Sequence, residues 1–244
     1  MSKRTGLEVA IPYNETYFEP NCGRNITSIF DGFDITISSL EDYRDIKLNE
    51  VEFPFHYVDD AVEDFTDMKG FFQSEKYFCN AKSEVIQQLQ FKQYVKDIIF
   101  DKLDSGYYPD PSKCTSLHIR LGDYTYKRNH HPSQPASYWQ QAIKEAGLEK
   151  IIIFSDDVKM AKQMFGESSK LVYSTDSDPF VALYHMSLCK NNIICNSTFG
   201  WWGAWLGEQT TKHDKTVIAP SIWFGPGHSK FDTCDIIPDR WLKI

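Results

Sequence analysis

The chain has few arginines. Only six of its 26 basic residues are Arg, and its 34 acidic residues bring the formal net charge to −8. A chain with this charge is not expected to bind nucleic acid or an anionic membrane non-specifically, although a local basic pocket for a small anionic ligand is compatible with it. An Arg at a special position in the fold therefore merits attention.

The sequence also lacks the marks of a membrane or secreted protein. No run approaches the roughly 18 apolar residues of a spanning helix, and MSKRTGLEVAIP has no signal-peptide core. The six cysteines form no CxxC pair, so we expect buried thiols in a reducing compartment rather than disulfides. We expect a soluble cytoplasmic protein, with peripheral membrane association left open, whose three sequons are accidental.

The chain organisation suggests two domains. Its 244 residues, 41% hydrophobic and 25% charged, are ordinary for a globular protein. Strands are expected at 6–12, 33–38 and 51–58, and two helices within 71–103. Residues 104–113 (DSGYYPDPSK) collect Gly and Pro and predict a linker. We therefore divide the chain into an N-terminal domain, 1–105, and a C-terminal domain, 106–244.

The C-terminal half alternates short apolar runs with helical patterns. This alternation predicts βαβ units and a parallel sheet covered on both faces, with ligands at the carboxyl ends of the strands. The expected strands are 114–121, 150–155, 170–174, 192–197 and 215–220, and the expected helices are 135–147, 156–166, 178–191 and 199–207.

The first candidate site is LHIRLGDY, residues 117–124. His118 and Arg120 alternate with apolar residues and lie on one face of the expected strand. A guanidinium at a strand's carboxyl end suits a diphosphate, because its planar fork binds two oxygens. Asp123 can orient that Arg, and a purely structural Arg–Asp pair is the competing interpretation.

The second candidate is IIIFSDD, where Ser155, Asp156 and Asp157 follow an apolar strand. Ser or Asp in this place usually caps the next helix. The functional alternative is a carboxylate that accepts hydrogen bonds from a ribose or a base edge.

The third candidate is CNSTFGWWGAWLG, residues 195–207. Asn196, Ser197 and Thr198 precede a helix that is apolar all round, which is typical of a buried helix. Its free N–H groups and the neighbouring hydroxyls form an anion site. We therefore expect the tryptophans to be core and the polar start to be the site.

Two other patterns point less clearly to a metal. Asp176 and Asp178 form a DxD triplet that can hold a divalent ion, but Pro179 explains Asp178 as an ordinary helix cap. His130 and His131 have no partners at helical spacing, so we expect no zinc site there.

Together these motifs resemble glycosyltransferase family 11, the α-1,2-fucosyltransferases. HIRLGDY is similar to the family signature HxRRGDY, FSDD to its second motif, and ICNSTFGWWGAWL to N-S-S/T-F-S-W-W-x-A-x-L. GFFQSEKYF, YHMSLCKNNII, VIAPSIWFGP and DIIPDRWLKI also resemble family segments. The likeness runs from about residue 70 onward.

The resemblance implies an α/β, GT-B-like fold with two Rossmann-like domains facing a cleft. It implies inverting transfer of L-fucose from GDP-fucose to a galactose hydroxyl of a glycan, in α-1,2 linkage, without cofactor or essential metal. It assigns the donor diphosphate to Arg120 and to Ser197 and Thr198, and the nucleotide to Asp156. His118, Asn196 and Phe199 complete the expected donor site, and Asp123 and His131 are the candidates for catalytic base.

Two departures from the family pattern keep alternatives open. Leu121 stands where the signature has a second Arg, and the chain begins at SKRTGLEV, the segment that follows the family's glycine-rich GGLGNQ loop. We therefore expect that loop to be missing. One alternative is a non-catalytic nucleotide-sugar-binding or scaffold protein. The other is a metal-dependent glycosyltransferase that uses Asp176 and Asp178.

Overall fold

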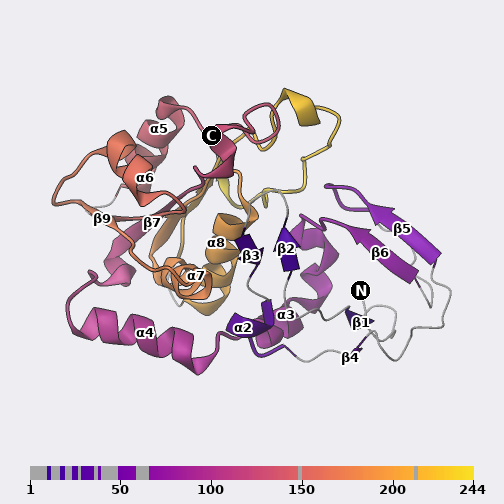
Figure 1. Cartoon of the computed structure of the whole chain (residues 1–244), viewed down its shortest axis with the longest axis horizontal. Coiled ribbons are helices and arrows are strands. Elements are labelled where there is room, and N and C mark those ends of the chain that lie inside the picture. Colours follow the sequence, from indigo (N-terminus) through magenta and orange to yellow (C-terminus); the bar gives the residue numbers. More distant parts are fainter. Residues whose placement is uncertain are drawn as a thin grey trace. The chain divides into compact units, whose positions relative to one another are not determined.

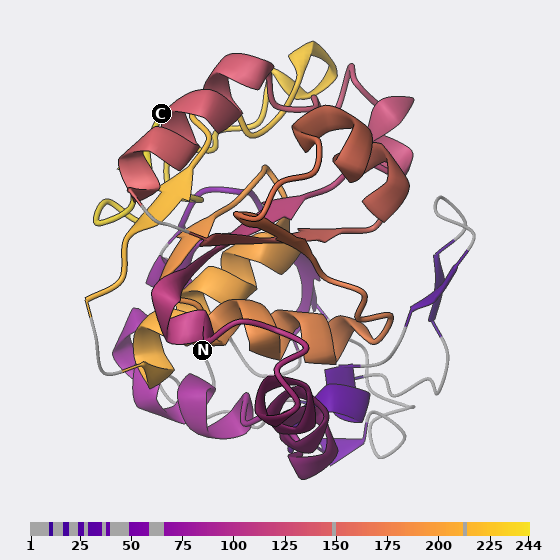
Figure 2. The same ribbon diagram turned by 90° about the vertical axis from the view of Figure 1, so that its left-hand side faces the viewer.

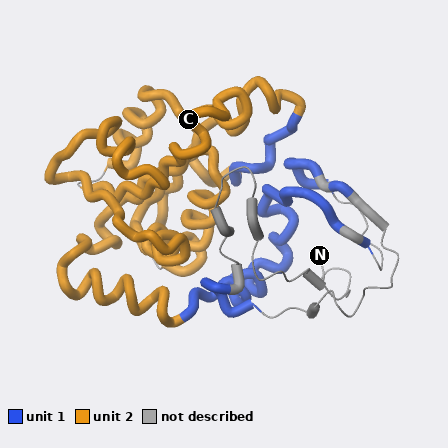
Figure 3. Tube along the Cα trace, viewed as in Figure 1, with its two compact units in different colours: residues 1–92, 231–238 blue, residues 93–230, 239–244 orange. Residues whose placement is uncertain are grey.

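The computed structural model describes residues 10–11, 17–19, 24–26, 29–35, 38–39, 49–58, 66–147, 150–211 and 214–244. The chain divides into two compact units, residues 1–92 with 231–238 (unit 1) and residues 93–230 with 239–244 (unit 2) (Figure 3). Helix α4 (Gln93–Asp104) and the Gly- and Pro-containing segment 104–113 both fall in unit 2. The division between the compact units lies before α4, and the sequence places the domain boundary at residue 105. Tyr108 within the expected linker is buried.

Unit 1 contains short elements. Three two-stranded sheets pair β1 (Ala10–Ile11) with β4 (Ser38–Ser39), β2 (Tyr17–Glu19) with β3 (Arg24–Ile26), and β5 (Asn49–Phe53) with β6 (Thr66–Gly70). Its helical segments are α2 (Ile29–Gly32), α3 (Lys82–Gln88) and the 3₁₀ turns η2 (Glu75–Tyr77) and η3 (Cys79–Ala81). Much of the Rossmann-like domain expected here, including most of the strand at 6–12, lies outside the described residues.

Unit 2 is built on a six-stranded parallel sheet with the order β12-β11-β10-β7-β8-β9. The five expected strands are confirmed, and a short sixth follows them. The strands are β7 (Cys114–Ile119), β8 (Lys150–Ser155), β9 (Leu171–Tyr173), β10 (Asn191–Ile193), β11 (Val217–Ala219) and β12 (Leu242–Lys243). β12 escaped prediction because it is a two-residue exposed edge strand with no apolar run.

The helices of unit 2 begin and end at residues whose local chemistry predicts a helix boundary. Gly147 takes φ 64° after α5, Asp157 accepts a hydrogen bond from the amide of Met160, and Pro179 opens α7 behind the cap Asp178. The helices are α5 (Ala136–Ala146), α6 (Val158–Phe165), α7 (Pro179–Leu188) and α8 (Thr198–Thr210), with 3₁₀ turns η4 (Pro111–Lys113), η5 (Asp123–Thr125) and η6 (Pro226–His228).

Helices cover both faces of the sheet (Figure 2). On one face, Leu117 and Ile119 of β7 share a buried cluster with Trp139 of α5 and Ala161 of α6. The side chains that alternate with these along each strand lie on the other face, which α7 and α8 cover. For example, Phe154 of β8 packs edge-on against His185 of α7. The central strands of the sheet are therefore shielded from solvent on both faces, and ligands are expected at the carboxyl ends of the strands.

Two expectations about buried residues have different outcomes. Two of the three tryptophans of α8 are core, as predicted: Trp205 is fully buried and stacks on the buried Trp201 at 6.3 Å, whereas Trp202 is partly exposed. The cysteine prediction is wrong in part, because Cys79 and Cys234 are exposed while Cys114, Cys189 and Cys195 are buried. All five are free thiols, and Cys22 lies outside the described residues.

Candidate functional site

The topology of unit 2 brings the three polar motifs to one edge of the sheet. From β7 the chain proceeds outward through β8 to β9, and then returns to β10 on the other side of β7. Strands β7 and β9 are labelled in Figure 1. The switch point of such a sheet lies between β7 and β10, where ligands bind at the carboxyl ends. Leu117 pairs with Ile193, and Ile119 pairs with Ser155. The segments after β10, β7 and β8 therefore lie next to one another.

Arg120 lies directly after β7, between two carboxylates. Its Nε donates to Oδ1 of Asp123 at 3.0 Å and lies 3.3 Å from Oδ2 of Asp156. Burial alone would lower the pKa of Arg120, but Asp156 and Asp123 raise it above its usual range. The guanidinium is thus permanently charged and held in one direction at the sheet edge, while 30% of its side chain is exposed.

Asp156 holds the loop that carries Arg120. Its Oδ1 accepts from the amide of Leu121 at 2.8 Å, and its Oδ2 accepts from the amide of Gly122 at 3.1 Å. A Cβ on Gly122 would lie 2.4 Å from that Oδ2, so only glycine permits this approach. The capping interpretation applies to Asp157, whose carboxylate caps α6, and not to Asp156.

His118 lies beneath the start of α8. Its Nδ1 is 3.5 Å from the Sγ of Cys195, and its ring packs against Phe199 at 5.4 Å. Burial lowers the pKa of His118 to about 4, so the ring is neutral at pH 7. A Cβ on Gly200 would lie 2.6 Å from Nδ1, which makes Gly200 the residue that admits the imidazole here.

The start of α8 offers donors at this edge. Ser197 is the N-cap residue, yet its side chain makes no capping hydrogen bond, and Thr198 is exposed. The first amides of an α-helix have no partner within the helix, so they point toward the solvent edge with these hydroxyls. A link to Arg120 runs through Cys195, whose Sγ accepts from the Arg120 amide at 3.3 Å.

Asn196 is buried, in contrast to Ser197 and Thr198. Its Oδ1 accepts from Nε2 of Gln134 at 3.0 Å, and its Nδ2 donates to the carbonyl of Trp223 at 2.8 Å. Tyr124 donates to the Asn196 carbonyl at 2.9 Å. The side chain therefore ties together the loops after β7, β10 and β11, and its amide bonds lie within the protein.

Gln134 and Tyr124 belong to this arrangement but were not candidates from the sequence. Gln134 also donates to the carbonyl of Ile222 at 3.1 Å, and its own carbonyl accepts from Nε1 of Trp139 at 3.2 Å. A single polar residue in a Pro- and Ser-containing loop gives no signal of burial. Only the tertiary contact with Asn196 reveals it.

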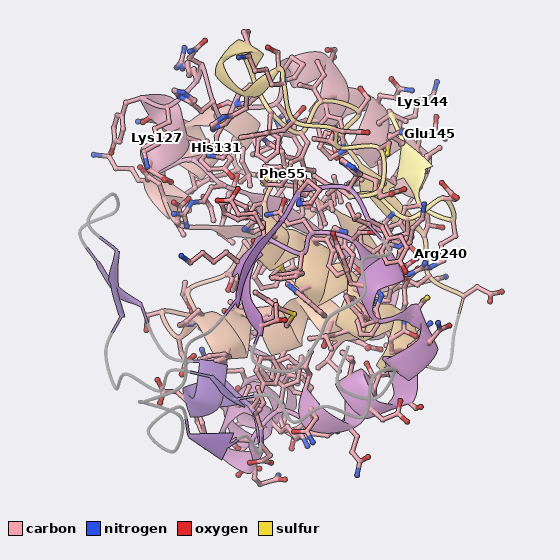
Figure 4. All side chains as sticks on the ribbon, turned by 90° about the vertical axis from the view of Figure 1, so that its right-hand side faces the viewer. Phe55, Lys127, His131, Lys144, Glu145 and Arg240 are labelled. Atoms are coloured by element: carbon pink, nitrogen blue, oxygen red, sulfur yellow. The ribbon has the colours of Figure 1, made fainter. Side chains whose placement is uncertain are left out.

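His131 and Asp123, the two candidate bases, differ in their environments. The His131 ring stacks on Tyr124 at 4.9 Å, and its buried Nδ1 makes no hydrogen bond within the described residues. Burial and the neighbouring His228 lower the pKa of His131. Asp123 is paired with Arg120 and with Lys127, which lies on the same loop as His131 (Figure 4). Burial alone would raise its pKa, but these cations lower it.

Leu121, which departs from the signature, has a packing role. Its side chain is 2% exposed and belongs to the buried cluster beneath α5 and α6. The side chain at this position therefore points into the core, away from the carboxyl edge where Arg120 is held.

The two carboxylates of the DxD pair have separate partners within the protein. Asp178 caps α7 through the amide of Phe180 at 2.8 Å. The side chain of Asp176 is buried, pairs with Lys102 and accepts from the hydroxyl of Ser174 at 2.9 Å. These carboxylates are committed to a helix cap and an internal ion pair, which argues against the metal-dependent alternative for these residues. Within the described ranges, no group of three or more His, Cys, Asp or Glu is arranged to hold a metal ion.

No helix in the described part of the chain combines the length and the apolar character needed to cross a membrane.

The comparisons with known proteins identify the family of this chain. Residues 33–232 match the family model Glycosyl transferase family 11. The O-antigen biosynthesis glycosyltransferase WbnK of Escherichia coli is 39% identical over 54% of this chain and 45% of its own length. The alpha-1,2-colitosyltransferase of Escherichia coli is 29% identical over 77% of this chain and 65% of its own. The chain thus spans about half to two thirds of these relatives.

The solved structures bear on the fold alone. The fucosyltransferase NodZ from Bradyrhizobium matches with a TM-score of 0.51 at 12% identity, covering 84% of both chains. A NodZ structure soaked with GDP-fucose matches with the same TM-score at 14% identity and with the same coverage. The fold is therefore α/β and GT-B-like, and the chain belongs to glycosyl transferase family 11.

Proposed function

We propose that this glycosyltransferase moves L-fucose from GDP-fucose to a galactose hydroxyl of a glycan, in α-1,2 linkage, with inversion and without an essential metal. The observation that carries the proposal is the meeting of Arg120 with the start of α8 at the switch point between β7 and β10. One relative, an alpha-1,2-colitosyltransferase, supports the linkage, and one structural neighbour, the NodZ alpha-1,6-fucosyltransferase soaked with GDP-fucose, supports the donor.

The donor diphosphate would lie between Arg120 and the hydroxyls and amides of Ser197 and Thr198. As the bond from the sugar C1 to the diphosphate breaks, negative charge develops on the leaving oxygen. Donors fixed before the reaction stabilise that charge without reorganising. Asp156 and Asp123 supply this fixation, since each anchors the guanidinium within 3.3 Å.

The nucleoside would extend toward β8. In Rossmann-type sheets an acidic residue after the second strand binds a ribose hydroxyl, and Asp156 holds that place. Oδ1 of Asp156 accepts one backbone hydrogen bond, so it has accepting capacity for a hydroxyl. His118 and Phe199 support the site from below, and Asn196 holds the start of α8 in place.

The acceptor hydroxyl attacks C1 from the side opposite the leaving diphosphate, which inverts the configuration, and its proton must go to a base. We assign this role to His131 rather than to Asp123. The pKa of His131 is lowered, so its imidazole is neutral at pH 7. The carboxylate of Asp123 is instead paired with Arg120 and Lys127. The sharpest test is the acid limb of the pH–rate profile for His131→Gln, with exposed His130→Gln as control.

Calorimetry with GDP and GDP-fucose tests the donor site. Arg120→Ala should abolish measurable binding, Arg120→Lys should weaken it, and Arg128→Ala, which alters an exposed Arg in the following loop, should leave it unchanged. Addition of EDTA should change nothing. Equal affinity of wild type and Arg120→Ala for GDP would contradict the assignment.

A turnover assay distinguishes a transferase from the alternative of a non-catalytic nucleotide-sugar-binding protein. Leu121 stands where the signature has a second Arg, and this departure in sequence favours a nucleotide-sugar-binding protein without catalysis. Binding of GDP-fucose without transfer to lactose, or to a panel of galactosides, would support that alternative. Assays with GDP-colitose beside GDP-fucose would establish which donor sugar the chain uses.

A further inference from the structure

Two aromatic–polar pairs of neighbouring residues lie side by side in unit 1. Phe55 and Phe231 pack with ring centroids 4.5 Å apart, and the residues after them, His56 and Asp232, lie 3.9 Å apart between Nδ1 and Oδ2. Phe55 is labelled in Figure 4. The two pairs come from distant parts of the chain, so the fold, and not local sequence, joins them.

A third ring completes the cluster. Phe71 stacks on Phe55 nearly in parallel, at 4.8 Å with an interplanar angle of 15°. Phe55 is buried, whereas Phe71 is 69% exposed and Phe231 is 42% exposed. Phe55 therefore supports two rings that present apolar area to solvent, a placement that burial of apolar surface does not favour.

The backbone beside Phe71 is strained. Phe72 takes φ 47°, the one positive φ among the described non-glycine residues, and for a bulky side chain this is an outlier. Its ring packs against Tyr77 at 5.5 Å, and Tyr77 donates to the carbonyl of His56 at 2.9 Å. The surrounding contacts thus hold a conformation that directs Phe71 outward, as strained residues do at binding sites.

The segment that carries Phe231 is anchored independently. Asp235 accepts from the amide of Tyr57 at 3.2 Å and pairs with Lys76. Phe231 and Asp232 are therefore fixed relative to Phe55 and His56 before any ligand arrives, which lowers the entropic cost of binding.

We propose that Phe71 and Phe231 form a stacking platform for a pyranose ring of the acceptor glycan, with Asp232 and His56 at its polar edge. A galactoside has an apolar C–H face that fits an aromatic ring and a rim of hydroxyls that fits a carboxylate and an imidazole. Aromatic walls with a few placed polar groups are typical of small-ligand sites. The inference rests on the proposed function, because it assumes a sugar acceptor.

The experiment needs no donor and no turnover, so its failure is distinct from failure of the proposed transfer reaction. Saturation-transfer NMR on the full chain with methyl β-galactoside and with lactose would report which ligand protons contact aromatic rings. Phe71→Ala and Phe231→Ala should each raise the Kd about tenfold, Asp232→Asn should raise it less, and Phe71→Tyr should retain affinity.

Phe100→Ala is the matched control, because Phe100 is a 48% exposed ring on α4 of unit 2. It should leave both Kd values unchanged, and calorimetric binding of GDP should be the same in all variants. The proposal is overturned if neither galactoside receives saturation transfer from the wild type. It is also overturned if Phe71→Ala and Phe100→Ala have the same effect.

Discussion

Nε of Arg120 lies 3.3 Å from Oδ2 of Asp156, although the two residues follow different strands. We expect Asp156→Asn to destabilise the protein by about 1–3 kcal/mol, because one buried amide of the loop loses its acceptor. GDP affinity should fall about tenfold, since Arg120 loses its second anchor. Urea unfolding and calorimetry measure both effects. Asp157→Asn is the control, because Asn also caps helices well; equal effects of the two substitutions would contradict the role of Asp156.

Gly200→Ala should displace His118. The added Cβ would lie 2.6 Å from the imidazole Nδ1, and the His118 ring is buried, so it has little room to move away. We expect a loss of about 1–3 kcal/mol in the free energy of unfolding from overpacking. Gly203→Ala, whose Cβ would come no closer than 3.2 Å to Met186 and 3.4 Å to Leu183, gains the same helix propensity and serves as the comparison. Equal stability of the two variants would sink this interpretation.

His118 should make the fold sensitive to acid. Its folded pKa of about 4 lies below the ordinary 6.5, so between these values the unfolded chain binds a proton that the folded chain does not. The free energy of unfolding therefore falls as pH drops from 6.5 toward 4, by on the order of 3 kcal/mol. Denaturant titrations at pH 6.5 and 5 should show a smaller drop for His118→Asn than for wild type. An identical drop would exclude His118 as its source, and exposed His130→Gln is the control.

Asp176→Asn should destabilise unit 2 by about 2–3 kcal/mol, because it leaves Lys102 without its buried counter-charge. Burial alone would raise the pKa of Asp176, but the neighbouring His185 and the bonds from Lys102 and Ser174 lower it from the ordinary 3.8 to about 2. The wild-type advantage is thus complete above pH 4 and is lost as pH falls toward 2. Unfolding at pH 7 and 3 measures this. The double variant with Lys102→Met should recover part of the loss, and no recovery would refute the pairing.

Thiol labelling should separate the cysteines into two classes. Cys79 and Cys234 are exposed and should react with a disulfide reagent in the native protein. Cys114, Cys189 and Cys195 should react only on unfolding, and burial raises the pKa of Cys195 to about 12. A Cys22→Ser background isolates these five. Rapid native labelling of Cys195 would contradict the packing beneath Arg120.

The sequence by itself determined the secondary structure of unit 2 and the identity of the site motifs. Apolar runs such as IIIF and caps such as Asp157 and Asp178 act through local chemistry, so their elements follow from short stretches. The parallel sheet follows from their alternation, and the sheet places Arg120 and Ser197 at its carboxyl edge.

The tertiary structure decided how these residues are used. Asp156 and Asp157 are adjacent acids, yet the position of the β7 loop makes one an anchor for Arg120 and the other a helix cap. Gln134 became part of the site because Asn196 lies opposite it, and Asp176 became an internal ion pair because α4 brings Lys102 to it. Local patterns specify elements, whereas the partner of a polar side chain depends on residues that only folding brings together.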